Sequence, residues 1–242
     1  MDSRYFDRRG YPIVGAAVGY SKWAETYEDT VAVGLDRPLL ERVRSIEWKS
    51  VQQAADLACG TGRTGAWLKQ QGVQRVDGVD ITPEMLALAE KRGAHDRLFT
   101  GDVQSSPLDS SDYDLATLVL ADEHLADVAP VYLEASRLLK YGGKFLLVGY
   151  HPFFLMNGMP THYHRADGSA VTIESHVHLF SDHFKAGRTA GLSLIEMEEC
   201  VIDEDWLATK PKWRKHLHWP VSFALVWQKR RQPADQIAGD PQ

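Results

Sequence analysis

The sequence predicts an α/β fold in which a doubly wound, mostly parallel sheet of seven strands ends in an antiparallel last strand. Three observations support this prediction. Between residues 53 and 150, short apolar segments alternate with segments of helical periodicity, which is typical of βαβ units. A glycine-rich loop follows the first of these apolar segments. The last two apolar segments, at residues 192–202 and 221–227, form a hairpin-like end, which makes the final strand antiparallel.

The length and composition limit the possible functions. At about 150 residues per domain, 242 residues predict a single domain spanning residues 1–242 with some additional segments. The net charge of −6 argues against nucleic acid as a partner, because proteins that bind phosphate backbones carry a basic stripe. No apolar segment approaches the ~18 residues of a membrane span, so no membrane partner is expected. Two cysteines do not make a disulfide framework, which predicts a cytoplasmic location.

The elements are expected in the following order. Residues 1–36 form an N-terminal arm and helical lid, in which residues 1–19 are irregular and residues 20–33 are helical, and Pro38 opens a further helix. Strands are predicted at residues 53–58, 75–80, 98–101, 113–120, 144–150, 192–202 and 221–227, with helices at residues 64–71, 83–92, 128–139 and 181–190. Residues 151–180 interrupt the alternation as an inserted cap that contains a β-hairpin, and residues 229–242 form a polar, mobile tail.

The glycine-rich loop spans Asp56 to Gly65 and lies between the first strand and the next helix, where α/β proteins bind cofactors. Gly60 and Gly62 allow a tight turn and a close approach of the backbone to a ligand. The helix that follows presents free N–H groups at its N-terminus. Either a dinucleotide or a nucleoside with a charged tail would suit such a loop.

Asp80 ends the second strand, 20 residues beyond Gly60. A carboxylate at this position accepts hydrogen bonds from both hydroxyls of a ribose. Gly60, Gly62 and Gly65 also satisfy the dinucleotide spacing Gly-x-Gly-x-x-Gly. A nicotinamide-dependent reductase therefore stays open as an alternative at this point.

The motifs together resemble those of the class I S-adenosylmethionine-dependent methyltransferases, which have a Rossmann-like fold. The loop from Asp56 to Gly62 is similar to the family's Asp-x-Gly-x-Gly-x-Gly signature, and the segment after Asp80 is similar to its acid-x-Ser/Thr-x-x-Met-Leu segment. Gly101-Asp102-Val103 resembles the Gly-Asp-Ala segment that contacts adenine, and residues 138–143 resemble the Leu-Leu-Lys-Pro-Gly-Gly turn. Residues 20–29 resemble the helix that often covers the cofactor. The resemblance extends over residues 20–228 and implies methyl transfer from S-adenosylmethionine.

The resemblance implies a cofactor role for each residue that matches a motif. These residues are Tyr20, Asp56, Ala58, Gly60, Gly62, Asp80, Ile81, Met85, Asp102, Val103, Leu120 and Ala121. Asp56 would hold the loop and reach the cofactor amino group through water, while Gly60 and Gly62 would lie against the methionine part. Asp80 would bind the ribose, and Tyr20 would donate to the cofactor carboxylate, although packing of the first helix explains Tyr20 equally well.

The remaining roles concern the adenine and the sulfonium. Ile81 and Met85 would pack on the adenine, although ordinary helix packing also explains Met85. Asp102 would accept from the exocyclic amine, and Val103 would offer its backbone N–H. Residues 120–121 would lie beneath the sulfonium.

The sequence departs from the family's motifs at two positions. Ala58 replaces the first glycine of the loop, which is tolerated if its φ is negative. Tyr141 replaces the usual proline before the fifth strand, which affects only the rigidity of the turn.

The acceptor of the methyl group is expected to be a small molecule. The fourth strand is followed by Leu120-Ala121-Asp122-Glu123-His124 and lacks the Asn/Asp-Pro-Pro-Tyr/Phe motif of the related DNA amino-methylating enzymes. His151, directly after the fifth strand, and His124 are the candidate bases, since an imidazole pKa of ~6.5 suits proton removal near neutral pH. A homodimer is possible. A cofactor-binding regulator without catalytic activity is the second functional hypothesis.

The predicted cap contains two pairs of histidines, His162 with His164 and His176 with His178. A two-residue turn at Asp167-Gly168 would pair His164 with Val171 and His162 with Ile173. The two histidine pairs would then lie on opposite faces of the hairpin, so no metal site is expected there.

Overall fold

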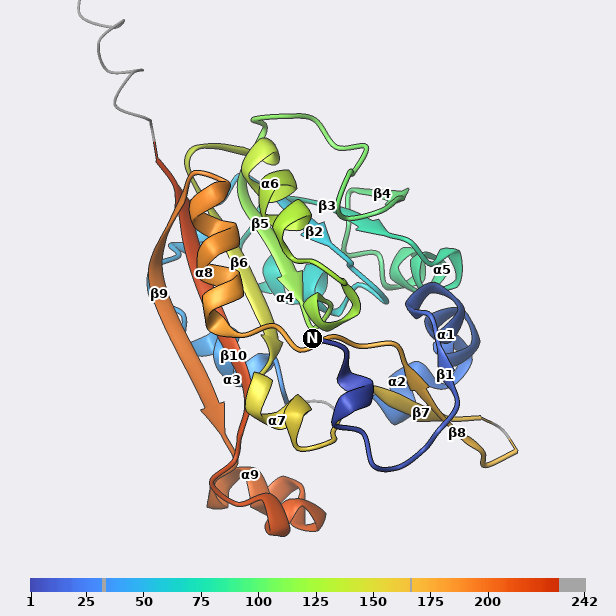
Figure 1. Ribbon diagram of the computed structural model, residues 1–242. Helices are drawn as coiled ribbons and strands as arrows, with labels where there is room; N and C mark the ends of the chain where they lie inside the picture. Colours follow the sequence, from blue (N-terminus) through green and yellow to red (C-terminus); the bar gives the residue numbers. More distant parts are fainter. Residues whose placement is uncertain (32–33, 166, 231–242) are drawn as a thin grey trace, which may run out of the picture.

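A computed structural model describes residues 1–31, 34–165 and 167–230 (Figure 1). Its main sheet has seven strands in the order β4-β3-β2-β5-β6-β10-β9. The strands are β2 (Gln53–Leu57), β3 (Arg75–Asp80), β4 (Arg97–Thr100), β5 (Tyr113–Val119), β6 (Leu139–Tyr150), β9 (Leu192–Val201) and β10 (Pro220–Lys229). β10 runs antiparallel to both β6 and β9. The predicted α/β sheet with an antiparallel last strand is confirmed.

Helices cover both faces of the sheet, as a parallel sheet requires (Figure 1). They are α3 (Arg37–Arg42), α4 (Arg63–Gln71), α5 (Pro83–Arg92), α6 (Ala129–Leu138) and α8 (Phe180–Thr189). Alternate residues of each strand enter two separate cores. Ala54 belongs to the core under α3 and α4, and Ala55 to the core under α6 and α8.

The N-terminal segment is more ordered than the sequence predicts. Residues 13–14 form strand β1 (Ile13–Val14), and the first long helix, α1 (Ala16–Trp23), begins before residue 20. The predicted helix 20–33 is divided into α1, a 3₁₀ turn η2 (Ala24–Thr26) and α2 (Tyr27–Thr30), and its residues 32–33 lie outside the described part of the chain. β1 pairs in parallel with a strand of the cap, which the local pattern of residues 1–19 did not reveal.

The cap contains α7 (Pro152–Met156) and the strands β7 (His162–His164) and β8 (Ala170–Ile173). Together with β1 they form a small sheet in the order β1-β8-β7 (Figure 1). The predicted hairpin register is wrong by one residue, because His164 pairs with Ala170 and His162 with Thr172. The reason is a longer loop, which the Arg165 N–H closes by donating to the Ser169 carbonyl over 2.8 Å.

Strand β8 ends at Ile173, so the alternation of faces along the hairpin does not reach the second histidine pair. His162 instead lies 2.8 Å from the Arg9 guanidinium, and His178 donates to the Leu125 carbonyl over 2.8 Å. Among the described residues, no group of three or more His, Cys, Asp or Glu side chains is arranged to hold a metal ion.

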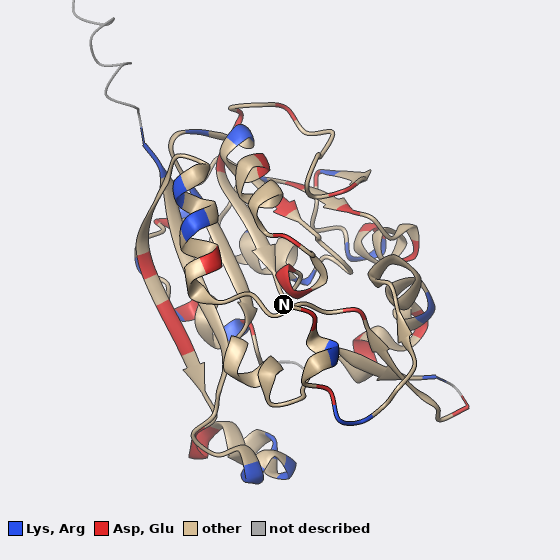
Figure 2. Ribbon diagram, viewed as in Figure 1, with Lys and Arg blue, Asp and Glu red and all other residues tan. Residues whose placement is uncertain are grey.

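The short elements that remain are α9 (Glu204–Thr209) and the 3₁₀ turns η1 (Ser3–Tyr5), η3 (Trp48–Ser50), η4 (Asp122–His124) and η5 (Pro211–His216). The predicted tail begins too early, because Lys229 is the last residue of β10, and residues 231–242 lie outside the described residues. No helix within residues 1–31, 34–165 and 167–230 is both long and apolar enough to cross a bilayer. Acidic and basic segments are interspersed over the side of the molecule shown in Figure 2.

Candidate functional site

A cavity of about 260 Å³ opens at the carboxyl ends of β2, β3 and β5, where the strand order reverses. Ligands of open α/β sheets bind at such a reversal. α1 and α2 contribute Tyr20 and Tyr27 to the lining, and the loops after the strands contribute most of the rest. All the predicted cofactor residues line this cavity except Asp56 and Gly62.

The glycine-rich loop turns back sharply because three alternate residues adopt positive φ. These are Ala58 at 55°, Gly60 at 53° and Gly62 at 83°. A Cβ on Gly60 would meet no atom within 4 Å, so the cavity side of this glycine is open to a ligand. The condition under which Ala58 would be tolerated, a negative φ, is not met, and the residue is held in a conformation that costs an L-residue about 1–2 kcal/mol.

Gly62 and Gly65 have packing roles. A Cβ on Gly62 would lie 3.3 Å from the Cα of Ala89 on α5, and a Cβ on Gly65 would lie 2.4 Å from the ring of His95. Both glycines therefore allow close contact between elements. Neither glycine lines the cavity. Packing between elements therefore explains why Gly62 and Gly65 match the spacing Gly-x-Gly-x-x-Gly.

Asp56 lies beneath the loop and is 1% exposed. Its Oδ1 accepts from the Thr117 hydroxyl over 2.8 Å, and its Oδ2 lies 3.0 Å from Nε2 of His95. The structure thus places Asp56 among protein partners, away from the cavity where the resemblance implied a contact with the cofactor amino group.

Asp80 is 7% exposed and lines the cavity. Its Oδ2 accepts from the Gly60 N–H and its Oδ1 from the Thr82 N–H, each over 2.8 Å. Burial raises the pKa of this carboxyl and outweighs the two backbone hydrogen bonds, which lower it. Each oxygen retains a free lone pair for a further donor.

The residues expected around an adenine lie together at one end of the cavity. Met85 and Val103 are buried, whereas Ile81 is 51% exposed. Asp102 accepts from the backbone N–H of Gln104 over 2.9 Å, and Gln104 itself lines the cavity.

The other end of the cavity brings two predicted residues into direct contact. The Tyr20 hydroxyl lies 2.9 Å from Nε2 of His124, and Nδ1 of His124 lies 2.7 Å from the Glu174 carbonyl. A carbonyl can only accept, so Nδ1 carries a proton, and in the neutral ring Nε2 then accepts from the Tyr20 hydroxyl. Residues 120–121 complete this end, and Leu120 has a positive φ of 54°.

His151 is placed outside the cavity lining. Its Nδ1 accepts from the Phe153 N–H over 3.1 Å and caps α7, so its Nε2 carries the proton and donates to Glu199 over 2.9 Å. Burial lowers the pKa of the ring and outweighs the opposing effect of Glu199. Of the two predicted bases, only His124 lines the cavity.

Several cavity residues were missed, among them Arg63, Asp36 and Tyr27. Arg63 is the first residue of α4, directly after the glycine loop, and this position could have identified it as a cavity residue. Asp36 and Tyr27 belong to the N-terminal segment, which is distant from the loop in sequence. Nη2 of Arg63 and Oδ2 of Asp36 are 3.8 Å apart, and Oδ1 of Asp36 is buried without a hydrogen-bond partner within the described part of the chain. Burial raises the pKa of Tyr27 to about 12.

Residues 55–147 match the protein family described as "Methyltransferase domain". The relatives include the uncharacterized methyltransferase YcgJ of Bacillus subtilis, which is 30% identical over 137 residues, 54% of each chain. A malonyl-[acyl-carrier protein] O-methyltransferase of Serratia marcescens is 28% identical over 131 residues, 54% of this chain and 50% of the relative. The chain therefore spans about half the length of the curated relatives it matches.

A solved structure with the same fold is an S-adenosylmethionine dependent methyltransferase from Mesorhizobium loti. The TM-score is 0.65 at 21% sequence identity, and the alignment covers 79% of this chain and 96% of that one. Residues 55–147 thus resemble a methyltransferase domain, and the chain shares the fold of this S-adenosylmethionine dependent methyltransferase.

Proposed function

We propose that the protein is an S-adenosylmethionine-dependent methyltransferase that acts on a small-molecule acceptor. The observation that carries the proposal is Asp80. It is a buried carboxylate at the carboxyl end of β3, it is held in place by two backbone N–H groups, and it faces the cavity. Its free lone pairs suit the two hydroxyls of a ribose.

The residues around the cavity fit the rest of the cofactor. The open side of Gly60 leaves room for the chain of the methionine part. Asp36 and Arg63 suit the α-ammonium and the α-carboxylate of the cofactor, respectively. Oδ1 of Asp36 has no hydrogen-bond partner among the described residues, and the α-ammonium would supply a donor. We assign these two residues to the amino-acid end and Asp102 with Val103 to the adenine.

S-Adenosylmethionine, when bound, supplies an electrophilic methyl group on a sulfonium sulfur. The protein contributes position and alignment, and His124 accepts a proton where the acceptor has to lose one. His124 suits this role because its Nδ1 donates to the Glu174 carbonyl, which leaves Nε2, where the Tyr20 hydroxyl is bound, as the basic nitrogen.

A small acceptor is supported by the net charge of −6 and by the interspersed charges seen in Figure 2, because neither favours a polyanion. Tyr20 and Tyr27, which face the acceptor end, lie outside the segment 55–147 that matches the family. The acceptors named for the relatives are therefore only candidates for this chain. We further propose a cytoplasmic location, which suits two buried, free cysteines, and leave a homodimer as a possibility.

Calorimetry with S-adenosylmethionine and S-adenosylhomocysteine tests the cofactor, with NADH as the control ligand. We expect saturable binding of the first two and no binding of NADH. Incubation with methyl-labelled S-adenosylmethionine and a cell extract, divided into small-molecule and macromolecular fractions, then tests the acceptor. Binding without any label transfer would favour the regulator hypothesis, and label in nucleic acid would contradict the proposal.

A further inference from the structure

We propose that Tyr20, His124 and Glu123 form a proton relay that removes the proton of a hydroxyl acceptor, a phenol or an enol. Glu123 serves in it as a positioning residue that acts through His124. This inference rests on the proposed function, because Tyr20 and His124 line the same cavity.

The relay begins at Tyr20. Its hydroxyl donates to Nε2 of His124 over 2.9 Å, and one lone pair of its oxygen is left to accept from a ligand in the cavity. Burial raises the pKa of Tyr20 well above its ordinary value, so the phenol stays protonated near neutral pH. Tyr20 therefore passes a proton to His124 and is not itself the base.

Glu123 precedes His124 in the chain and is 1% exposed. Its Oε1 is 3.4 Å from Nε2 of His124 and accepts from the Thr161 hydroxyl over 3.2 Å. Its Oε2 is buried and has no hydrogen-bond partner among the described residues. A buried carboxylate with so few donors is costly, and a positive charge on the adjacent imidazole would compensate it.

Further titratable groups surround the relay on several elements. Asp122, the neighbouring carboxyl in η4, has its pKa raised well above the ordinary range, first by burial and then by Glu123, so it keeps its proton. Tyr27 from α2 and Tyr150 from β6 have pKa values raised mainly by burial and stay neutral. The segment after β8 adds Glu174 and His176 near the outer side of His124.

The methyl transfer and the proton transfer require no group beyond the acceptor, the cofactor, Tyr20 and His124. The acceptor oxygen forms its bond to the methyl carbon while its proton passes to the Tyr20 oxygen and the Tyr20 proton passes to Nε2 of His124. The bond between the methyl carbon and the sulfur breaks, and its electron pair remains on the sulfur as a neutral thioether. One positive charge thus moves from the sulfonium to the imidazolium, next to Glu123, and is later released as a proton to solvent.

The same geometry argues for the class of acceptor. A carboxylate acceptor is already ionised near neutral pH and needs no base, and Glu123, 3.4 Å from Nε2 of His124, would repel it. A protonated amine would place a second cation beside the sulfonium. A neutral hydroxyl avoids both costs and requires the proton acceptor that the cavity provides.

The test uses 4-nitrophenol as the probe, because its phenolate has its own visible absorption band. The full-length protein is saturated with S-adenosylhomocysteine, and the ionisation of the bound probe is followed against pH. Because Glu123 stabilises the imidazolium, we expect the bound probe to ionise at lower pH than in free solution. In E123Q this midpoint rises by about one pH unit, a tenfold loss in proton transfer, and in H124Q the effect disappears.

The matched control is D122N, which alters the adjacent buried carboxyl but removes no charge and should leave the midpoint unchanged. Y20F provides a second test of the relay if E123Q does not fold, and it should slow the transfer of the proton. An unchanged midpoint in E123Q and H124Q, or binding of 4-nitrobenzoate in place of 4-nitrophenol, would overturn the proposal. Calorimetry with S-adenosylhomocysteine on the same samples separates this result from a failure of the cofactor assignment.

Discussion

Replacement of Asp80 provides the sharpest test of the cofactor site. The carboxylate accepts from two backbone N–H groups over 2.8 Å each and is proposed to accept from two ribose hydroxyls. Hydrogen bonds to a charged group contribute about 1.5–3 kcal/mol each, so losing both ribose contacts in Asp80→Ala costs about 3 kcal/mol or more. At 1.36 kcal/mol for each factor of ten, the dissociation constant of S-adenosylhomocysteine should rise at least about 100-fold.

The same substitution should also lower stability, because the loop at Gly60 loses an anchor. Relief of the buried charge offsets part of this loss, so the net decrease in the free energy of unfolding should be about 1–2 kcal/mol. Asp80→Asn keeps one acceptor oxygen and should weaken binding by roughly tenfold. Isothermal calorimetry and chemical unfolding measure the two effects separately.

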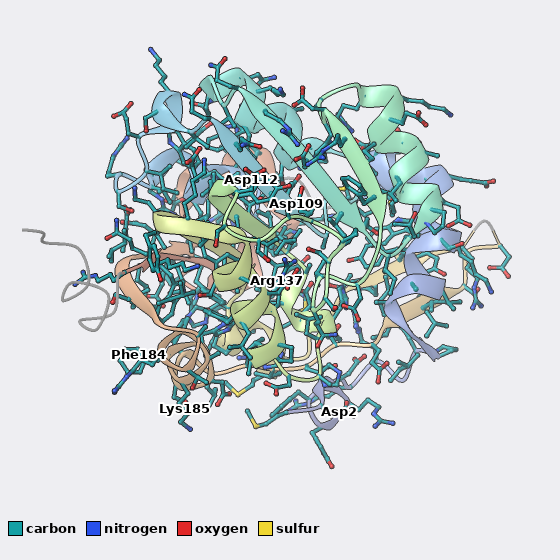
Figure 3. All side chains as sticks on the ribbon, turned by 90° about the horizontal axis from the view of Figure 1, so that it is seen from above. Asp2, Asp109, Asp112, Arg137, Phe184 and Lys185 are labelled. Atoms are coloured by element: carbon teal, nitrogen blue, oxygen red, sulfur yellow. The ribbon has the colours of Figure 1, made fainter. Side chains whose placement is uncertain are left out.

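The raised pKa of Asp80 adds a pH dependence to binding. Ribose hydroxyls favour the ionised carboxylate, so affinity should increase as pH rises through this raised pKa and then level off, with proton release at the acidic end. Asp80→Asn should lack this dependence. Asp109→Asn is the matched control and should keep the pH dependence. Asp109 is exposed in the loop between β4 and β5 and lies outside the cavity lining (Figure 3). Unchanged affinity in both Asp80 variants would refute the ribose assignment.

Three further predictions concern stability and the lid. Burial raises the pKa of Asp77, but hydrogen bonds from Arg97 and other donors outweigh burial and lower it. The ionised carboxylate therefore stabilises the fold above pH 3.8, and this stabilisation is lost as pH falls through the lowered pKa. Acid unfolding, followed against pH, should be less steep in Asp77→Asn. Ala58→Gly should change the free energy of unfolding by less than about 1 kcal/mol, because relief of the positive φ offsets the added freedom of the unfolded chain, whereas Ala58→Val should lower it by more than about 2 kcal/mol in urea unfolding. Glu28 in α2 accepts from Arg92 of α5 over 2.6 Å, so Glu28→Gln should speed hydrogen exchange in residues 16–31 while the exchange of β5 stays the same.

The main sheet could be predicted because its signals are local. Alternation of apolar and helical segments depends on residues within one element, and β3 and α5 have the bounds that the pattern predicted. The glycine loop and Asp80 were also predictable, because the end of a parallel strand and the turn that follows it are adjacent in sequence.

The cap and the acceptor end were predicted less well because their contacts join distant residues. The hairpin register depends on the backbone contact between Arg165 and Ser169, which turn residues alone did not indicate. His151 follows a strand end, as a catalytic residue often does, yet its two ring nitrogens are occupied by protein partners. Asp56 matches a motif, but it hydrogen-bonds to Thr117 and His95 and lies outside the cavity lining.

The sequence by itself determined the sheet, the loop that faces the cofactor and the acidic residue at the end of the second strand, because short-range periodicity and strand-to-helix turns specify them. Only the tertiary structure decided which side chains face the acceptor. Tyr20 and His124 are 104 residues apart in the chain, and their contact exists only because the fold brings α1 against η4, the turn that follows β5. The direction of a side chain at such a junction depends on packing between elements, which no local pattern of residues records.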